Sequence, residues 1–219
     1  EMQRSLVGSE MCIRDSIVLA FVGIYIVRTV VSVAVQGVSD GSGMQYVKEW
    51  AAMFKNPMMW LNIAALPINY FFVFIAFFGE EYGWRYYLQP VLQKRFGLRA
   101  GVIILGVVWG LWHIPDDLFY YTQTSGIQMI FAQQITCISL GIFFAYAYMK
   151  TQNIWVPVCL HYLNNNLIPI ISGTFSADVL ENQTVSWKDL PVALVLNGLC
   201  FGFFLLADVF KKKEVQEEE

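Results

Sequence analysis

The feature that most constrains this chain is a series of long apolar stretches, each close to the length of a helix that crosses a lipid bilayer. A spanning helix needs about 20 predominantly apolar residues. Strands of a membrane β-barrel would instead be short and would alternate in polarity with a period of two. The stretches therefore predict an all-α fold, a polytopic transmembrane helical bundle of about six spans. They lie near residues 17–35, 58–90, 98–115, 127–149, 154–172 and 190–210.

Composition agrees with a location in the cell membrane. Hydrophobic residues make up 57% of the 219-residue chain and charged residues only 14%, whereas a water-soluble domain carries about 25% charged residues. The net charge of −3 makes nucleic acid an unexpected partner, because proteins bind its phosphates through basic residues. The four cysteines are widely spaced and form no CxxC or Cys/His motif, so neither a disulfide framework nor a structural zinc site is expected.

The two ends of the chain differ from the apolar region between them. Residues 1–16, EMQRSLVGSEMCIRDS, are polar and show no helical apolar period; they look like translated sequencing-adaptor read-through, so we expect a non-native or disordered segment. On that interpretation the natural N-terminus and one or more leading helices are missing. We expect residues 17–210 to form a single transmembrane domain and residues 211–219 a charged cytoplasmic tail. The connections 36–56 and 173–189 are expected to be exposed loops.

Basic residues predict the orientation in the membrane, because cytoplasmic connections carry an excess of Lys and Arg. One side of the predicted bundle holds most of them, whereas the connections on the other side are mainly acidic. We therefore predict a multi-pass protein with a cytoplasmic C-terminus. The basic residues on the predicted cytoplasmic side are Arg85, Lys94, Arg95, Arg99, Lys150, Lys211, Lys212 and Lys213.

A few ionisable residues fall inside the apolar stretches, where they are costly and by default mark a functional site. They are the adjacent pair Glu80 and Glu81 and both histidines of the chain, His113 and His161. At 1.5 Å per residue, Glu80, His113 and His161 lie about 17–21 Å from the basic residues at the cytoplasmic ends of their helices. They are therefore predicted to share one layer of the bundle. This requires the second span to continue as helix to about Gln93, with Pro67 breaking or kinking its start.

Helical spacing gives each of these groups a neighbour on its own helix face, because residues four apart lie one above the other. Three pairs have this spacing: Glu81 with Arg85, Trp109 with His113, and His161 with Asn165. We expect Glu81 and Arg85 to form an ion pair, since a lone charge at this depth is expensive. Glu80 points about 100° away from Glu81 and is expected to face a cavity lined by the two histidines.

This set of side chains favours a carboxylate base acting on water. The sequence has no GxSxG motif, no HExxH motif and no cysteine one helical turn from either histidine. Glu80 is the expected general base, acting on a water that His113 also holds. His161 and Asn165 are the expected donors to the oxyanion. Each side chain alone could be a packing feature or an interhelical hydrogen bonder, so it is their joint occurrence that indicates a site.

A zinc site is the competing interpretation. Two histidines and one glutamate, here His113, His161 and Glu80, form a zinc ligand set with an open position for water. Sequence does not separate a metal-bound water from one held by the same side chains directly. We favour the version without a cofactor, because Asn165 is a poor zinc ligand but a good hydrogen-bond donor.

Three motifs at these residues resemble the type II CAAX prenyl endopeptidase family, also described as the CAAX-protease and bacteriocin-processing family of intramembrane proteases. The motif EExxxR is present as Glu80-Glu81-Tyr82-Gly83-Trp84-Arg85, an aromatic–His motif as Trp109 and His113 in WGLWHIP, and HxxxN as His161 to Asn165. The resemblance implies the same roles for Glu80, His113, His161 and Asn165, with Glu81, Arg85 and Trp109 in support. Two departures are Trp109 in place of a common Phe, and Asp116-Asp117 in place of a common apolar pair; we expect the acidic pair to alter the mouth of the cavity.

The resemblance also implies the substrates. Family members cut membrane-associated or prenylated, CAAX-like proteins near the C-terminus; eukaryotic members remove the last three residues, and bacterial members are linked to bacteriocin immunity, peptide processing and scaffolding. A non-enzymatic immunity or scaffolding protein is therefore the alternative function. A proton-coupled transporter is disfavoured, because no inverted repeat or pair of broken helices is evident.

Overall fold

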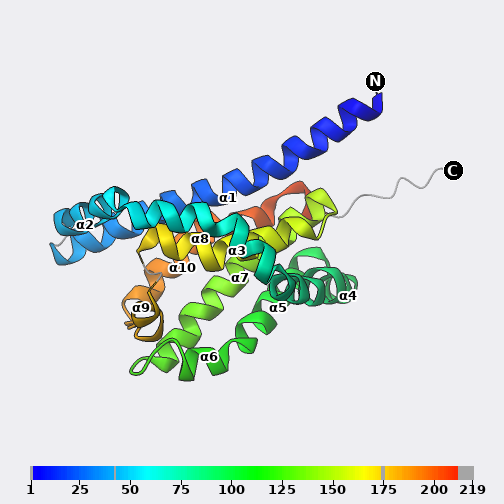
Figure 1. The fold of residues 1–219 in the computed structure, drawn as a ribbon. Coiled ribbons are helices and arrows are strands. Elements are labelled where there is room, and N and C mark those ends of the chain that lie inside the picture. The colour runs from blue at the N-terminus through cyan, green and yellow to red at the C-terminus, as the bar shows by residue number, and fades with distance from the viewer. Residues whose placement is uncertain (1, 42, 174–175, 212–219) are drawn as a thin grey trace.

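The described part of the computed structural model, residues 2–41, 43–173 and 176–211, is built from helices and contains no strand. The predicted all-α fold is therefore confirmed. Figure 1 shows α7 running through the middle of the bundle, with α5 and α6 on one side and α1, α3 and α8 crossing it on another. The predicted charged tail lies outside the described residues, apart from Lys211.

The helices follow one another with short connections. Their bounds are α1 Met2–Asp40, α2 Gly43–Lys55, α3 Pro57–Glu81, a π-helix Tyr82–Leu88, α4 Gln89–Phe96, α5 Leu98–Trp112, α6 Ile114–Phe119, α7 Gly126–Thr151, α8 Trp155–Ser172, α9 Ala177–Glu181 and α10 Asp189–Cys200, with 3₁₀ turns at Gly202–Leu206 and Asp208–Phe210.

Fewer helices than predicted are long and apolar enough to cross a membrane. In the described residues there are four such segments, Cys12–Val35, Pro57–Phe96, Leu98–Phe119 and Gly126–Thr151, against the six that the sequence predicts. The stretch 154–172 forms α8, but the run Asn164 to Asn166 lowers its apolar character. The stretch 190–210 is helical only to Cys200 and continues as 3₁₀ turns. The chain is nevertheless a helical membrane bundle.

The second span is one continuous helical segment, Pro57–Phe96, as the depth argument requires. It begins at Pro57, which needs no hydrogen-bond donor there, after the cap Asn56, whose side chain accepts from the N–H of Met58 at 3.0 Å. Pro67 lies inside α3, so of the two expected effects, a break or a kink, the break is wrong and the kink stays a prediction. Membrane helices tolerate proline where other groups satisfy the freed carbonyl.

Two predicted boundaries differ from the structure. Helix α1 extends from Met2 to Asp40, so residues 2–16, which we set apart on their composition, continue the first helix. The predicted loop 36–56 contains α2, which is amphipathic: Trp50 packs against Phe54 and donates to the Ile171 carbonyl at 3.0 Å. Tertiary contacts of the aromatic face therefore outweigh the Gly- and Ser-rich start of this segment.

The core lies around α7. Phe143 and Phe144 of α7 are buried against Phe21 of α1, with ring centroids 5.6 and 5.9 Å apart. Helix α5 approaches α7 closely because glycine faces it: a Cβ added at Gly106 would lie 2.6 Å from the Ile138 Cα. Glycine lets membrane helices pack backbone to backbone. This close packing fixes the end of α5, from which Trp109 and His113 project.

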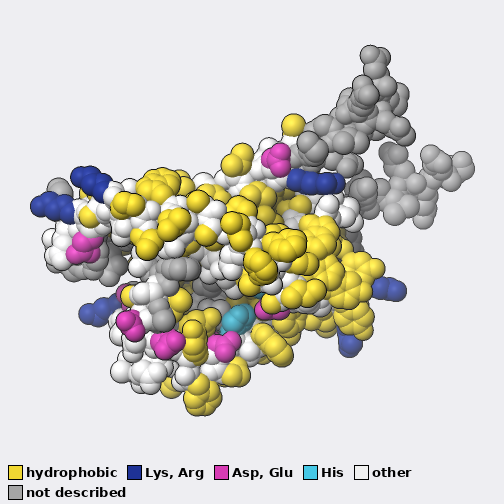
Figure 2. Space-filling model, viewed as in Figure 1, with side chains coloured by type: hydrophobic (Ala, Val, Ile, Leu, Met, Phe, Trp, Pro, Cys, Tyr) yellow, Lys and Arg dark blue, Asp and Glu magenta, His cyan; other side chains and the backbone are white. Residues whose placement is uncertain are grey.

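The outer surface is apolar, as lipid contact demands. Figure 2 shows hydrophobic side chains over much of the visible face, with Lys and Arg near its edges. On α3, for example, Phe71, Phe72 and Ile75 are exposed. Exposed apolar area of this extent is not found on soluble monomers.

Candidate active site

Three charged or ionisable side chains meet in the interior of the bundle. Glu81 at the end of α3 is fully buried, and its Oε1 accepts from Arg85 Nη1 at 3.1 Å and from His161 Nδ1 of α8 at 2.8 Å. Arg85 is also fully buried, and His161 is only 3% exposed. The ion pair expected from the Glu81–Arg85 spacing is therefore present, and His161 joins it from a residue 80 positions away.

A π-helix positions Arg85. The α-helical pattern of α3 changes at Tyr82–Leu88, directly after Glu81, and returns in α4. A π-turn widens the helix by hydrogen bonding residue i to i+5 and is frequently found at functional sites. Here it keeps both Glu81 and Arg85 buried on one face while Tyr82, Tyr86 and Tyr87 are exposed.

Trp109 separates the two histidines and covers Arg85. Its ring centroid lies 5.4 Å from that of His161 and 5.8 Å from that of His113. The guanidinium carbon of Arg85 lies 4.6 Å from the Trp109 ring centroid and 5.1 Å from that of Phe144. Such cation–π contacts are strongest where water is excluded, so the aromatic pair helps to hold the arginine charge in the interior.

His113 lies at the C-terminal end of α5, with its tautomer fixed by the backbone. Its Nδ1 lies 2.9 Å from the carbonyl oxygen of Trp109, and since a carbonyl only accepts, Nδ1 carries the hydrogen. The other ring nitrogen, Nε2, is then a hydrogen-bond acceptor when the ring is neutral. His113 can therefore hold a water by one of the water's hydrogens.

The two adjacent glutamates differ in their surroundings, as their separation around the helix predicts. Glu81 is turned into the core, whereas Glu80 is partly exposed. Glu80 makes no hydrogen bond or ion pair within the described ranges, but it lies close enough to Arg85 and Cys137 to act on both electrostatically. Its carboxylate is free for another partner.

Asn165 is the predicted site residue that lies outside these contacts. It is exposed, and its Oδ1 accepts from Asn164 Nδ2 at 2.8 Å. Asn164 in turn accepts from the hydroxyl of Tyr25 on α1. Asn165 therefore shares the helix α8 with His161, while its side-chain N–H groups remain available as donors.

The predicted zinc ligands do not form a ligand group in this structure. Among the described residues, no three His, Cys, Asp or Glu side chains lie close enough together to hold a metal ion. His161 contacts Glu81 through Nδ1, whereas the sequence-based ligand set paired it with Glu80.

Two residues that the sequence did not assign to the site lie beside it. The Sγ of the buried Cys137 on α7 is 3.8 Å from His113 Nδ1; nothing in the sequence indicates this contact. Asp117 on α6, expected at a cavity mouth, is fully buried, and within the described part of the chain neither of its carboxylate oxygens has a hydrogen-bond partner. The sequence signal that could have identified Asp117 is an acidic side chain within an apolar segment. Burial, with the charges of Asp116 and Asp117, raises the pKa of Tyr121 to about 12 in the connection that follows.

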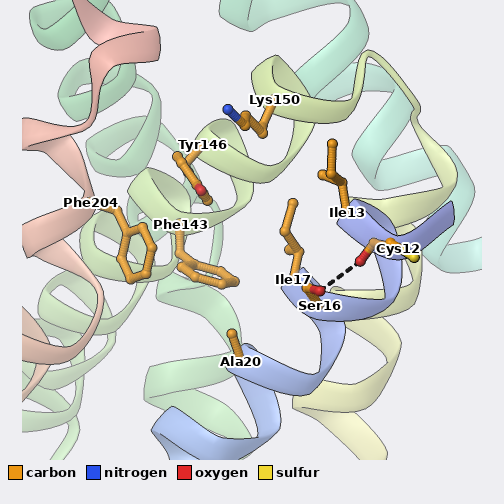
Figure 3. A pocket seen from close by; sticks show the side chains of 9 residues that line it. All are labelled: Cys12, Ile13, Ser16, Ile17, Ala20, Phe143, Tyr146, Lys150 and Phe204. Carbon is orange, nitrogen blue, oxygen red and sulfur yellow. Dashed lines mark hydrogen bonds between the residues drawn. The ribbon is translucent and has the colours of Figure 1, made fainter. Parts of the chain in front are cut away.

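The predicted site is distinct from the cavity drawn in Figure 3. That cavity, of about 410 Å³, lies between α1, α7 and the first 3₁₀ turn, and Figure 3 shows Phe143 and Ile17 on facing walls with Lys150 at one end. None of the predicted site residues lines it. Figure 2 instead shows a histidine at the surface between acidic side chains.

Comparisons with known proteins agree with the motifs. Residues 62–167 match the model of the family described as type II CAAX prenyl endopeptidase Rce1-like. A CAAX prenyl protease 2 from Methanococcus maripaludis is 27% identical over 125 residues, which cover 53% of this chain and 45% of that relative. The chain thus matches less than half the length of this relative, and no solved structure matches it. Residues 62–167, the segment that holds all three motifs, are thus similar in sequence to the Rce1-like type II CAAX prenyl endopeptidases.

Proposed function

We propose that this protein is a membrane-embedded endopeptidase that hydrolyses a peptide bond near the C-terminus of a membrane-associated or prenylated, CAAX-like substrate. The observation that carries the proposal is the buried contact of Glu81 with both Arg85 and His161, next to a free carboxylate on Glu80. A packing role alone does not call for four ionisable groups and a tryptophan in one apolar layer. The match of residues 62–167 to the family model supports the substrate class.

Glu80 and His113 activate the water in this mechanism. Glu80 accepts one proton of a water whose second hydrogen is held by Nε2 of His113, and the water oxygen attacks the peptide carbonyl carbon. The carbonyl oxygen becomes an oxyanion. The tetrahedral intermediate then collapses, the C–N bond breaks, and Glu80 returns its proton to the leaving amine nitrogen. The carboxylic acid that forms still carries the second hydrogen of the water and gives it up to the released amine, so the products are a carboxylate and an ammonium group.

His161 and Asn165 stabilise the oxyanion. His161 donates its Nδ1 hydrogen to Glu81, which orients the ring, and in this mechanism its second ring nitrogen, Nε2, is the one that donates a hydrogen to the oxyanion. The side-chain amide of Asn165 supplies a second donor. Arg85 binds Glu81 and holds it in place, so Glu81, Arg85 and Trp109 act by positioning His161.

Replacing the base tests the proposal. Glu80→Gln keeps the shape of the side chain but removes its basicity, and we expect cleavage of a farnesylated CAAX peptide in proteoliposomes to fall by about 10²–10⁴-fold. Glu49→Gln, at an exposed glutamate of α2, is the matched control. Full cleavage by Glu80→Gln would refute the mechanism.

The remaining outcomes separate the alternatives. Loss of wild-type cleavage on removal of zinc by a chelator, with recovery on adding zinc back, would establish the metal-dependent version. Absence of wild-type cleavage, together with a protective phenotype in cells that Glu80→Gln leaves intact, would establish the non-enzymatic immunity or scaffolding function.

A further inference from the structure

Arg28 is an arginine inside an apolar membrane span that the proposed mechanism does not use. It lies within the span Cys12–Val35 of α1. Its Nε is buried and has no hydrogen-bond partner among the residues that the structure describes, and its guanidinium carbon lies 5.7 Å from the centroid of the Tyr25 ring. A cation in a span is expensive and by default marks a pathway or a ligand. The structure therefore leaves a donor group unsatisfied at this point.

Arg28 lines a polar cavity of about 460 Å³ between α1, the connection after α9 and the start of α10. Lys188 adds a second positive charge, and the hydroxyls of Ser32, Thr184 and Ser186 add donors. Among the described residues of the lining one is acidic, Asp189, whose Oδ2 accepts from the backbone N–H of Ser186 at 2.8 Å. Neither Arg28 nor Lys188 forms an ion pair with a residue that the structure describes. Two unpaired cations with hydroxyl donors suit a carboxylate or another oxoanion.

A short chain of contacts joins this cavity to the candidate active site. Tyr25 lies one helical turn before Arg28 and donates its hydroxyl hydrogen to Asn164. Asn164 is three residues after His161 on α8, and three residues of helix advance about 4.5 Å. The step from Tyr25 to Arg28 along α1 is the same length. The path from His161 through Asn164 and Tyr25 to Arg28 includes these two steps. A few residues of extended peptide, at about 3.3–3.6 Å each, cover a comparable distance.

We propose that the cavity of Arg28 and Lys188 binds the C-terminal carboxylate of the peptide substrate, so that it selects substrates with a free C-terminus and sets how far from that end the cut falls. This inference rests on the proposed endopeptidase function. The guanidinium fork of Arg28 pairs with the two carboxylate oxygens, and Lys188 contributes a point charge at the rim. A lipid headgroup phosphate has similar chemistry, but the link through Tyr25 and Asn164 to α8 favours the peptide.

Peptide pairs test the proposal by binding as well as by cleavage. Two fluorescent farnesylated CAAX peptides, one with a free C-terminal carboxylate and one with a C-terminal amide, are titrated onto the Glu80→Gln protein in nanodiscs of zwitterionic lipid. We expect the acid to bind at least 10-fold more tightly than the amide. Adding Arg28→Gln should abolish this preference, whereas Arg28→Lys should keep part of it. Lys188→Gln should reduce it, and Lys55→Gln, at an exposed lysine outside the cavity, should not change it.

Cleavage by the protein with Glu80 intact separates the two hypotheses. A raised KM for the acid peptide in Arg28→Gln, with kcat and amide cleavage unchanged, supports the carboxylate site. If the Glu80→Gln protein, in which Arg28 is unchanged, binds the acid and the amide equally well, the carboxylate site is overturned, whether or not the protein with Glu80 intact cleaves. An Arg28→Gln defect that appears only in vesicles containing anionic lipid also overturns it and assigns the cavity to a headgroup. If the protein binds the acid more tightly than the amide but cleaves neither peptide, the proposed function is wrong and the carboxylate site stands.

Discussion

Glu81 is the single acceptor that two buried donors share. Arg85 and His161 both depend on its Oε1, and removing one partner of a buried ion pair strands the other charge in a low-dielectric interior. We expect Glu81→Gln to destabilise the protein by about 3 kcal/mol, because the amide retains a hydrogen bond but not the charge. Thermal unfolding in detergent measures the effect. The exposed Glu49→Gln serves as control, and equal melting temperatures for the two variants would show that the buried pair contributes no net stability.

Asp117 presents the opposite case, a buried carboxylate without a partner. Burial penalises the ionised form of an unpaired carboxyl group, so Asp117→Asn, which keeps the shape and cannot ionise, should stabilise the protein at a pH at which the carboxyl group is ionised. An increase of about 1–2 kcal/mol corresponds to a rise of roughly 2–8 °C in Tm for a chain of this size. Asp116→Asn, at the exposed neighbour, should leave Tm unchanged. A lower Tm for Asp117→Asn would mean that the carboxylate has a partner that stabilises the fold.

At the residue scale, sequence spacing predicted contacts within a helix better than contacts between helices. The Glu81–Arg85 pair follows from residues four apart on one face, and the structure contains it. The partner of His161 did not follow, because it depends on the rotation of α8 relative to α3, which spacing along one chain segment does not determine. The contact of Cys137 with His113 was not predicted for the same reason, because it depends on how α7 packs against the end of α5.

At the element scale, the close contact of α5 with α7 holds the histidine-bearing end of α5. Gly106 faces the α7 backbone, and Gly141 on α7 lies opposite, where an added Cβ would be 3.5 Å from the Gly106 Cα. Because the atom that a Gly106 side chain would meet is a backbone Cα, the helices must move apart to admit it. The geometry of Trp109 and His113 therefore depends on this glycine contact.

Substitution of this glycine should disturb stability and site together. We expect Gly106→Ala to cost about 1–3 kcal/mol through overpacking and to reduce activity, because α5 must shift. Gly23→Ala on α1 is the matched control: an added Cβ there meets nothing within 4 Å, so the substitution should be neutral or stabilise by about 0.5–1 kcal/mol. Thermal unfolding and peptide cleavage of both variants check this, and a Gly106→Ala protein with native Tm would contradict the close packing.

The length of the apolar stretches predicted where the helices lie. The Gly, Ser and Pro residues that we took as helix breakers, however, led to wrong predictions of where helices begin and end. The Gly- and Ser-rich segment before Gln45 suggested a loop, yet α2 forms because Trp50 and Phe54 find partners in the folded bundle. Pro67 suggested a break that the structure does not have. The π-helix at Tyr82–Leu88 has no sequence signature that distinguishes it from an α-helix, although it shapes the site.

At the scale of the whole molecule, the distribution of charge should set the orientation in the membrane. Lys94 and Arg95 lie in the last turn of α4 and are exposed, and we expect them to stay on the cytoplasmic side, where positive charge is retained during insertion. The acidic residues Asp116, Asp178 and Asp189 belong to the opposite connections. The site lies between these two ends, so the orientation determines from which side a substrate peptide enters.

Reporter fusions measure this orientation directly. We expect a reporter that is active only in the cytoplasm to be active when fused to the C-terminus, and one that is active only outside the cytoplasm to be silent. Replacing Lys94 and Arg95 by Gln removes two of the positive charges that hold this topology, so a fraction of molecules should invert and the second reporter should gain activity. Lys48→Gln with Lys55→Gln removes equal charge from the other side and should not cause inversion. Activity of the second reporter in the unmodified protein would reverse the orientation and place the acidic connections in the cytoplasm.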